Sequence, residues 1–379
     1  MSTPAIDTDS DLAFLKRATP PVLASFRDAD ISVVDLFSGC GGLTIGAIEA
    51  ATRLDHSVGI ALAIDHDVTP LSVLRKTLGL DSAHVTAQDL GSALRPIASP
   101  PSPAETAMFK SANRATGAKL LVAGPPCQGH SALNNHTRHN DPRNDLYLAV
   151  ARAARLVEPD AVVIENVRGV GADRGEALTR CAAALEELGY EVVHERLDLS
   201  QIGVPQTRIR HVLVATLGAP FQWILREAEA RTVGWAISDL LDIEPGPVID
   251  TPSLVSDENA ARIKWLFDND AYNLPNARRP KCHRDEKHSY ISMYGRLSWD
   301  APAQTITSGF GSMGQGRFVH PLLRRTLTPH EAARLQFLPD FMRLDLVPSR
   351  TALATMIGNV APPALTIAIV TALIEQDLL

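Results

Sequence analysis

The stretch ISVVDLFSGCGG at residues 31–42 decides the fold class of this chain. Its first half is a short apolar run rich in β-branched residues, which predicts a buried β-strand. Its second half is a glycine-rich turn, and a helix-like stretch follows over residues 43–51. A strand that runs through a glycine turn into a helix is typical of the first unit of an open α/β sheet.

The same strand–helix rhythm continues to residue 216. It predicts a doubly wound, mostly parallel, Rossmann-like α/β sheet with helices on both faces. Residues 92–116 are rich in Pro, Ala and Ser and predict a loop insertion. The further strands are predicted at residues 58–64, 84–86, 119–123, 161–164, 191–197 and 211–216, and the helices at 71–78, 145–156 and 175–188.

The rhythm stops after residue 216, which predicts a change of domain. Residues 217–295 are irregular and rich in Pro and Arg, as expected of a separate small domain. Two more helices are predicted beyond it, at residues 329–335 and 361–374. We therefore divide the chain into a frayed N-terminal lead-in (1–30), a strand–helix domain (31–216), the small domain with the support segment that follows it (217–320), and C-terminal helices that return to the strand–helix domain (321–379).

The composition excludes several classes of protein. With 45% hydrophobic and 21% charged residues in 379 positions, the chain is expected to be globular, with about two domains. It has neither the ~20 uninterrupted apolar residues of a membrane span nor the apolar core of a secretion signal, so no membrane is expected. The four cysteines (Cys40, Cys127, Cys181 and Cys282) form no C-x-x-C pair, which indicates no disulfide framework and a reducing cytoplasm. The formal net charge of −7 leaves the partner open, because binding depends on the local field of a cleft.

The glycine turn predicts a ligand site at the carboxyl edge of the sheet. Glycines let a ligand approach the backbone closely, and the helix N-terminus that follows carries a partial positive charge. Asp65 comes directly after the second predicted strand, where an acid can accept hydrogen bonds from ribose hydroxyls. From the residues alone, this signal is shared by NAD, FAD and S-adenosylmethionine sites, and a tight turn without a ligand is the alternative.

Three further motifs adjoin apolar strands and are predicted to reach the same region. GPPCQGHS, at residues 124–131, places Cys127 among prolines and polar residues, which favours an exposed thiol over a small buried hydrophobe. Glu165-Asn166-Val167 ends another strand, although a lone acid there is more often just solvated. QTRIR, at residues 206–210, leads into the last strand with two alternating arginines, for which surface salt bridges are the alternative.

Together these motifs resemble the cytosine-5 DNA methyltransferase family, in the same order and from about Ile31 to the C-terminus. RLSWDAPAQTIT, at residues 296–307, is similar to the segment that supports the family's target-recognition domain. GNVAPP, at residues 358–363, is similar to the last motif, which folds back beside the cofactor. The resemblance implies that the strand–helix domain binds S-adenosylmethionine and that the small domain recognises double-stranded DNA.

The resemblance also implies covalent chemistry on a flipped-out cytosine. Addition of the Cys127 thiolate to C6 would make C5 nucleophilic toward the methyl group. Glu165 would share a proton with N3, and Arg210, with Arg208 nearby, would hold the O2 atom and the DNA backbone. The base has to leave the duplex stack first, and residues 128–144 would close over the DNA as a mobile loop.

Phe37 would stack on the adenine of the cofactor, Asp65 would bind the ribose, and Asp89 would bind the adenine amine, again by resemblance. Two residues depart from the family pattern, because Asp65 stands where Glu is more frequent and His130 where Phe is usual. The first departure shortens the reach of the acid, and the second puts the packing of the loop in doubt. The other implied cofactor residues are Asp35, Ser38, Gly39, Cys40, Gly41, Gly42, Asn359 and Val360.

DNA contacts are implied near the predicted nucleophile and in the small domain, where a basic cluster is expected to read guanine or hold phosphates. Cys282, His283 and His288 could suggest zinc, but with no fourth ligand and no paired spacing we expect no metal. The residues concerned in DNA contacts are Pro126, Gln128, Ser131, Asn166, Arg278, Arg279, Arg284 and Arg296.

Rival functions stay open beside the DNA enzyme. A tRNA cytosine-5 methyltransferase would share the strand–helix domain, but the separate small domain and its support segment favour DNA. A catalytically silent, DNA-binding regulator would not need Cys127, Glu165 and Arg210, and a nicotinamide oxidoreductase would explain the glycine turn alone. We expect a cytoplasmic monomer, with a cognate restriction endonuclease or another defence component as a candidate partner.

Overall fold

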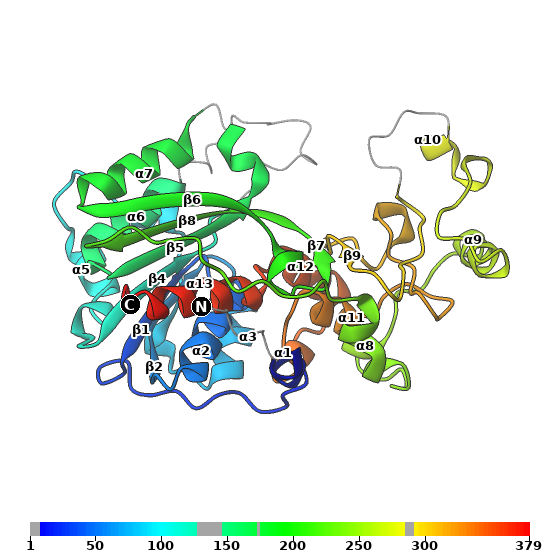
Figure 1. The fold of residues 1–379 in the computed structure, drawn as a ribbon, viewed down its shortest axis with the longest axis horizontal. Coiled ribbons are helices and arrows are strands. Elements are labelled where there is room, and N and C mark those ends of the chain that lie inside the picture. Colours follow the sequence, from blue (N-terminus) through cyan, green and yellow to red (C-terminus); the bar gives the residue numbers. More distant parts are fainter. Residues whose placement is uncertain (1–7, 127–145, 173–174, 285–291) are drawn as a thin grey trace.

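The computed structural model describes residues 8–126, 146–172, 175–284 and 292–379, and a seven-stranded sheet forms its centre (Figure 1). The strands are β1 (Ile31–Leu36), β2 (Val58–Asp65), β3 (Val85–Ala87), β4 (Ala118–Ala123), β5 (Ala161–Val167), β6 (Tyr190–Asp198) and β8 (Ile209–Leu217). Their order is β3-β2-β1-β4-β5-β8-β6. Only β8 runs antiparallel to its neighbours within this sheet. The prediction of a doubly wound, mostly parallel sheet is therefore confirmed.

Alternate side chains of the strands enter two hydrophobic cores, one on each face of the sheet. On one face lie α2 (Gly42–Arg53), α3 (Val68–Leu78) and α13 (Pro363–Glu375), and on the other lie α6 (Leu146–Val157) and α7 (Ala177–Glu187) (Figure 1). Strands that are buried on both faces read as nearly continuous apolar runs. This burial explains why the strands could be found in the sequence.

The glycine turn lies where the chain order reverses, since β1 stands between β2 and β4. At such a switch point a crevice forms outside the carboxyl ends of the strands. Gly39 and Gly41 have φ angles of 53° and 90°, which residues with a Cβ rarely adopt. A Cβ on Gly42 would collide with the carbonyl oxygen of Ala361. The turn is therefore closed on one side by the C-terminal part of the chain.

One described stretch, Arg350–Glu375, is long and apolar enough to cross a membrane. Here it is divided into α12 (Arg350–Asn359) and α13, with Val360 to Pro362 between them. Of its apolar window, 72% is buried inside the protein. α13 packs along α2, where a Cβ on Gly46 would collide with the carbonyl oxygen of Pro363. The stretch thus packs as core helices do.

The N-terminal part differs from the predicted frayed lead-in. α1 (Thr8–Leu15) is a helix whose Phe14 is fully buried. Asp11 accepts hydrogen bonds from both Arg53 and Arg231. The prediction was wrong for this helix, because the partners of Asp11 are remote in the sequence and leave no local signal.

The prediction of a loop insertion at residues 92–116 was also wrong. The segment contains α5 (Pro103–Met108), which begins with a capping box between Ser102 and Glu105. Glu105 also forms a fully buried ion pair with Arg152 of α6, with an N–O distance of 2.8 Å. The Ser-Pro-x-Glu signal of a helix start was present in the sequence, whereas the partner on α6 was not predictable.

The residues after β8 do not share one core. Val233 and Ile237 of α8 (Val233–Ile237) are buried in the same core as β1. A separate small core forms between α9 (Asp257–Asp268) and residues 293–319. Figure 1 shows α9 and α10 (Lys281–Arg284) at a distance from the sheet. The boundary at residue 217 stays a prediction, while α8 packs on α11 as part of the larger core.

A short parallel ladder ties the support segment to the QTRIR motif, between β7 (Gln206–Thr207) and β9 (Ala303–Gln304). The remaining helices are short. They are α4 (Leu90–Ala93), α11 (Pro329–Leu335) and the 3-10 helices η1 (Ser82–His84), η2 (Ala112–Arg114), η4 (Arg168–Ala172), η5 (Leu199–Ile202), η6 (Ser238–Leu240), η7 (Val248–Asp250), η8 (Asn276–Arg278), η9 (Met313–Gln315) and η10 (Leu344–Leu346).

Candidate functional site

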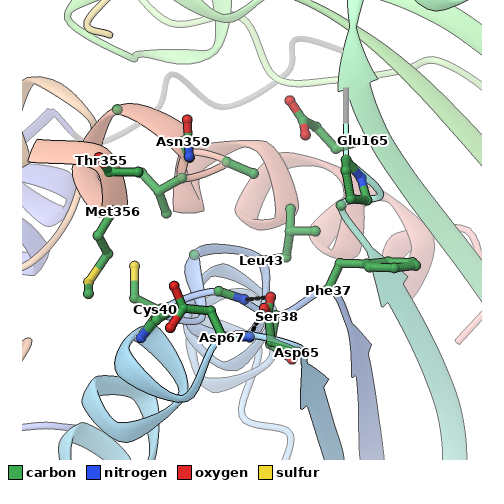
Figure 2. Close-up of a pocket in the computed structure, with 18 of the residues that line it drawn as sticks. Phe37, Ser38, Cys40, Leu43, Asp65, Asp67, Glu165, Thr355, Met356 and Asn359 are labelled. Atoms are coloured by element: carbon green, nitrogen blue, oxygen red, sulfur yellow. Dashed lines mark hydrogen bonds between the residues drawn. The ribbon is translucent and has the colours of Figure 1, made fainter. Parts of the chain in front are cut away.

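A cavity of about 630 Å³ lies over the glycine turn at the carboxyl edge of the sheet (Figure 2). Its walls come from the ends of β1, β2, β4 and β5, the start of α3, and α12 with the segment that follows it. The structure thus brings together residues from motifs that are far apart in the chain. The predicted residues that line it are Phe37, Ser38, Gly39, Cys40, Gly42, Asp65, Pro126, Glu165, Asn166, Arg208, Arg210, Asn359 and Val360.

Asp65 holds the glycine turn in place. Its Oδ2 accepts a hydrogen bond from the Gly39 amide at 2.8 Å, and its Oδ1 accepts one from the Asp67 amide at 2.9 Å. Ser38 Oγ donates to the carbonyl oxygen of Ile64 at 3.0 Å. The turn is therefore fastened to the end of β2, with the Asp65 carboxylate in the cavity wall (Figure 2).

Phe37 adopts a backbone conformation that non-glycine residues rarely take, with a φ of 59°. Such a conformation costs about 1–3 kcal/mol and tends to occur at functional sites. Figure 2 shows the Phe37 ring at one end of the cavity, with Thr355 and Met356 of α12 at the other end. Since the ring is only half-buried, a flat ligand group can stack on it.

Three predicted cofactor residues do not line the cavity. Asp35 is fully buried beneath the turn, where burial raises the pKa of its carboxyl group to about 7 although Thr44 donates a hydrogen bond to it. Gly41 is the N-cap of α2. Asp89 caps α4, and its carboxylate accepts a hydrogen bond from the Gly91 amide at 3.0 Å. Direct contacts of these residues with a ligand stay predictions.

Glu165 and Arg210 form an ion pair in the cavity wall, with 2.6 Å between Oε1 and Nε. Glu165 lies near the carboxyl end of β5 and Arg210 near the start of the antiparallel β8. Arg210 is opposite Val167, two positions after Glu165, so the sheet register brings both side chains to the same face. Both side chains are nearly buried, at 11% and 12% exposure. The arrangement places a carboxylate and a guanidinium together, as recognition of the polar edge of a base requires.

Asn166 fastens the proline turn that precedes the predicted nucleophile. Its Nδ2 donates to the carbonyl oxygen of Pro125 at 3.1 Å, and its Oδ1 accepts from the Val167 amide at 2.7 Å. Asn166 is 1% exposed, so its own hydrogen bonds are protected from water. Cys127, Gln128 and Ser131, together with the predicted loop 128–144, lie outside the described residues.

Arg208 and Arg210 differ in their surroundings, although the sequence grouped them. Arg208 is 3% exposed and directs its guanidinium at backbone carbonyl oxygens. Nη1 donates to Ile306 at 3.1 Å, and Nη2 donates to Val360 at 3.3 Å. Arg208 therefore links the support segment to the last motif, whereas Arg210 pairs with Glu165.

Two other cysteines can be compared with Cys127. Cys40 and Cys181 are free and buried. Burial raises the pKa of each thiol to about 12, so both are protonated at neutral pH. Neither thiol has the thiolate character that a nucleophile needs.

The wall contributed by α12 was missed by the sequence analysis. Ser349, Thr351, Ala352, Thr355 and Met356 line the cavity, and Figure 2 shows Thr355 and Met356 at the end opposite Phe37. These five residues lie outside the recognised motifs, although the last two residues of α12, Gly358 and Asn359, belong to the GNVAPP motif that was expected to fold back beside the cofactor. The motif was the signal that could have placed the preceding residues at the cavity.

The predicted DNA-binding arginines of the small domain are in different environments. Arg278 is exposed, and its guanidinium lies 5.1 Å from the Trp265 ring centre. Arg279 is half-buried and donates to the carbonyl oxygen of Leu274 at 3.2 Å. Arg284 is exposed at the end of α10.

Arg296 is 9% exposed and lies over the rings of Phe267 and Tyr272. Its Nε donates to the carbonyl oxygen of Pro321 at 3.0 Å, so the side chain is engaged inside the protein. In the part of the chain that the structure describes, no group of three or more His, Cys, Asp or Glu side chains could hold a metal ion.

A family model and related sequences agree on the family that this chain resembles. The family model of the C-5 cytosine-specific DNA methylases matches residues 31–375. The Type II methyltransferase M1.BsuMI of Bacillus subtilis is 41% identical over 89% of this chain and 78% of its own length. The Type II methylase M.HgiDII of Herpetosiphon aurantiacus is 30% identical over 88% of this chain and 92% of its own length.

Two solved structures share the fold. One is described as a DNA modification methyltransferase encoded within an E. coli prophage, with a TM-score of 0.62, 20% identity, and coverage of 91% of this chain and 99% of that chain. The other is the Dnmt2 methyltransferase of S. pombe, with a TM-score of 0.58, 17% identity, and coverage of 91% and 99%. Both support the Rossmann-like methyltransferase fold.

Proposed function

The chain belongs to the C-5 cytosine-specific DNA methylase family, and on this premise we propose that it methylates C5 of a flipped-out cytosine in double-stranded DNA through a covalent bond to Cys127. One observation carries the proposal. The Asp65-fastened glycine turn and the Glu165–Arg210 pair line the same cavity. A nucleoside cofactor on the turn would then lie next to a base held by the pair.

The family and the fold imply the use of S-adenosylmethionine, and the residues present fit it. The backbone of Gly39 faces open space, since a Cβ there would meet nothing within 4 Å among the described atoms. The Phe37 ring would stack on the adenine, and the Asp65 carboxylate would accept hydrogen bonds from the ribose hydroxyls. When bound, the cofactor supplies a methyl group activated by its sulfonium.

The residues of the chain would then make C5 reactive. The Cys127 thiolate would add to C6 and turn the ring into an enamine with a nucleophilic C5, the atom to which the bound cofactor would supply its methyl group. Glu165 shares a proton with N3 as charge develops on the ring, and Arg210 holds O2. After the transfer, the proton on C5 leaves to solvent or a base, and the bond between sulfur and C6 breaks to release the thiolate.

The substrate is tested by measuring transfer of a labelled methyl group from S-adenosylmethionine to duplex DNA and to tRNA in parallel. We expect transfer to duplex DNA, with the label recovered in 5-methylcytosine. Transfer to tRNA with none to DNA would make the chain an RNA enzyme instead. Binding of DNA without transfer to either substrate would identify a silent regulator.

We also propose partners and a cellular location for the chain, based on the names of its relatives. The matched relatives are named Type II methyltransferases, a class that modifies DNA beside a restriction endonuclease. The chain would accordingly act as a cytoplasmic monomer that protects the sites of such an endonuclease.

Substitution of Asp65 by alanine is expected to weaken binding of S-adenosylmethionine about tenfold to hundredfold. The variant loses charge-assisted hydrogen bonds, each worth roughly 1.5–3 kcal/mol, and releases the Gly39 amide. Isothermal titration calorimetry measures the change. Asp81→Ala is the matched control, because Asp81 is exposed and makes no side-chain cap. Equal affinity of Asp65→Ala and wild type would remove Asp65 from the cofactor site.

Substitution of Arg278 by alanine is expected to relax the recognition sequence at one position. A guanidinium stacked on Trp265 is partly pre-ordered for contact with guanine, and such a contact is worth roughly 1–3 kcal/mol of discrimination. Arg27→Ala is the matched control, since exposed Arg27 also stacks on a ring, that of Phe26, near the amino end of β2. A uniform loss of affinity with a flatter salt dependence would instead make Arg278 a phosphate contact.

A further inference from the structure

His330 of α11 lies between two carboxylates that come from different parts of the chain. Its Nδ1 is 2.8 Å from Asp250 Oδ1, and its Nε2 is 3.0 Å from Asp340 Oδ1. Asp250 ends η7, whereas Asp340 follows α11 by a few residues. The imidazole therefore bridges two segments that the backbone does not join directly.

Only the protonated imidazole can donate to both carboxylates, because the neutral ring carries one N–H and presents a lone pair on the other nitrogen. Burial by itself would lower the pKa of His330. The hydrogen bonds and charges of Asp340 and Asp250 outweigh that effect, and the pKa lies above its usual value. The charged ring is thus the form that matches the observed contacts.

The charges around the ring are nearly balanced. Arg334 of α11 is 1% exposed, and it pairs with Asp340 and with Asp239 of η6. Lys16 faces Asp239 from the N-terminal side at 3.5 Å. From α12, Arg350 donates to the carbonyl oxygen of Thr251. If His330 lost its proton, the three carboxylates of this cluster would retain Arg334 as their buried cation.

The segment that His330 holds leads into the small domain. Asp250 lies seven positions before Asp257, the first residue of α9. α9 contributes Ile263 and Leu266 to the separate small core. On the other side, α11 belongs to the main core of the sheet. η7 itself packs against this main core through Val248 and Ile249. The contact between His330 and Asp250 therefore fastens the end of η7 to α11, just before the chain runs on to α9 and the small core.

We propose that His330 in its protonated form is a positioning residue, which holds the segment that precedes α9 against α11 and so supports the binding of duplex DNA by the small domain. This inference rests on the proposed function, in which the small domain contacts DNA. His330 itself touches neither the cavity nor the exposed Arg278.

The direction of the pH dependence follows from the raised pKa of His330 in the folded protein. The contribution of protonated His330 to the stability of the folded protein is fully present below the ordinary histidine pKa of about 6.5. It is lost as the pH rises through the higher value of the folded state. Although burial alone would raise it, the pKa of Asp340 is lowered by His330 and Arg334, so this carboxyl group stays ionised over the range.

The test compares wild type with His330→Gln between about pH 6 and pH 9, using the affinity for duplex DNA and for S-adenosylmethionine. Loss of one charge-assisted hydrogen bond is expected to weaken the affinity for duplex DNA about tenfold. We expect the DNA affinity of wild type to fall about tenfold toward alkaline pH, whereas the variant binds weakly throughout. The affinity for S-adenosylmethionine should change with pH to the same extent in wild type and in His330→Gln. His56→Gln, which alters a histidine near Asp30 at the other end of the sheet, should follow the wild-type profile.

Asp250→Asn separates positioning from mere packing. It keeps the shape of the side chain but removes one of the charges that raise the pKa of His330, so the fall in DNA affinity should begin at lower pH. If the DNA affinity of Asp250→Asn fell at the same pH as that of wild type, the proposal would be contradicted.

Thermal unfolding gives a readout that does not depend on DNA. The difference in Tm between wild type and His330→Gln should narrow as the pH rises, and a constant difference would contradict the proposal. Absence of duplex DNA binding by wild type at every pH, together with a narrowing Tm difference, would instead overturn the proposed function and leave the pH-dependent contact supported.

Discussion

Replacement of Cys127 by alanine is expected to abolish methyl transfer to DNA and to leave the binding of S-adenosylmethionine unchanged. C5 of cytosine is a poor nucleophile until a thiolate has added to C6, so the first covalent step is lost. The cofactor is expected to contact the glycine turn, Phe37 and Asp65, and these are positioned by β1 and β2. Radiolabel transfer and calorimetry measure the two properties separately.

A trapping experiment makes the prediction specific to one sulfur. Duplex DNA that carries 5-fluorocytosine at the target retains the covalent adduct, because fluorine does not leave as a proton does. We expect an adduct of the wild type and of Cys181→Ala, the matched control. Burial raises the pKa of Cys181 to about 12. An adduct of equal yield with Cys127→Ala would show that another residue attacks the base.

Replacement of Glu165 by glutamine is expected to lower turnover about 10²–10⁴-fold, the range that a positioned acid or base contributes. Glutamine has nearly the same shape and can still accept a hydrogen bond from Arg210, so the wall of the cavity should persist. It cannot share a proton with N3, and the negative charge on the ring is then left unrelieved. Single-turnover kinetics at saturating DNA measure the chemical step.

The matched control for this variant is Glu195→Gln, which alters an exposed glutamate on β6. The control should turn over at the wild-type rate. The Glu165→Gln protein should also unfold close to the Tm of the wild type, because the substitution keeps the shape of the side chain. Wild-type turnover of Glu165→Gln would remove Glu165 from the chemistry and leave the ion pair with Arg210 as its function.

Much of the sheet could be predicted because its strands are buried on both faces. Ile31–Leu36 and Val58–Asp65 are buried at every position. Each therefore reads as a mostly apolar run, interrupted only by Ser32 and Asp35 in the first and ended by Asp65 in the second. The glycine turn and the Pro-Pro-Cys motif could be recognised because their glycines and prolines set the local backbone conformation. These signals lie within a few residues of one another and need no knowledge of the tertiary structure.

The features that were missed depend on distant contacts. Asp11 of α1 pairs with Arg53 and Arg231, which are 42 and 220 positions away. The different surroundings of Arg208 and Arg210 follow from the return of Val360 to the sheet. Periodicity and motif spacing carry no information about such pairings.

Sequencing of bisulfite-treated genomic DNA tests the central claim most directly. The host would be a bacterium without cytosine-5 methylation that expresses either the wild type or Cys127→Ala. We predict that the wild type protects cytosines from conversion within one defined sequence context, and that the variant protects none. No protected cytosine with the wild type, or equal protection by the variant, would contradict the account.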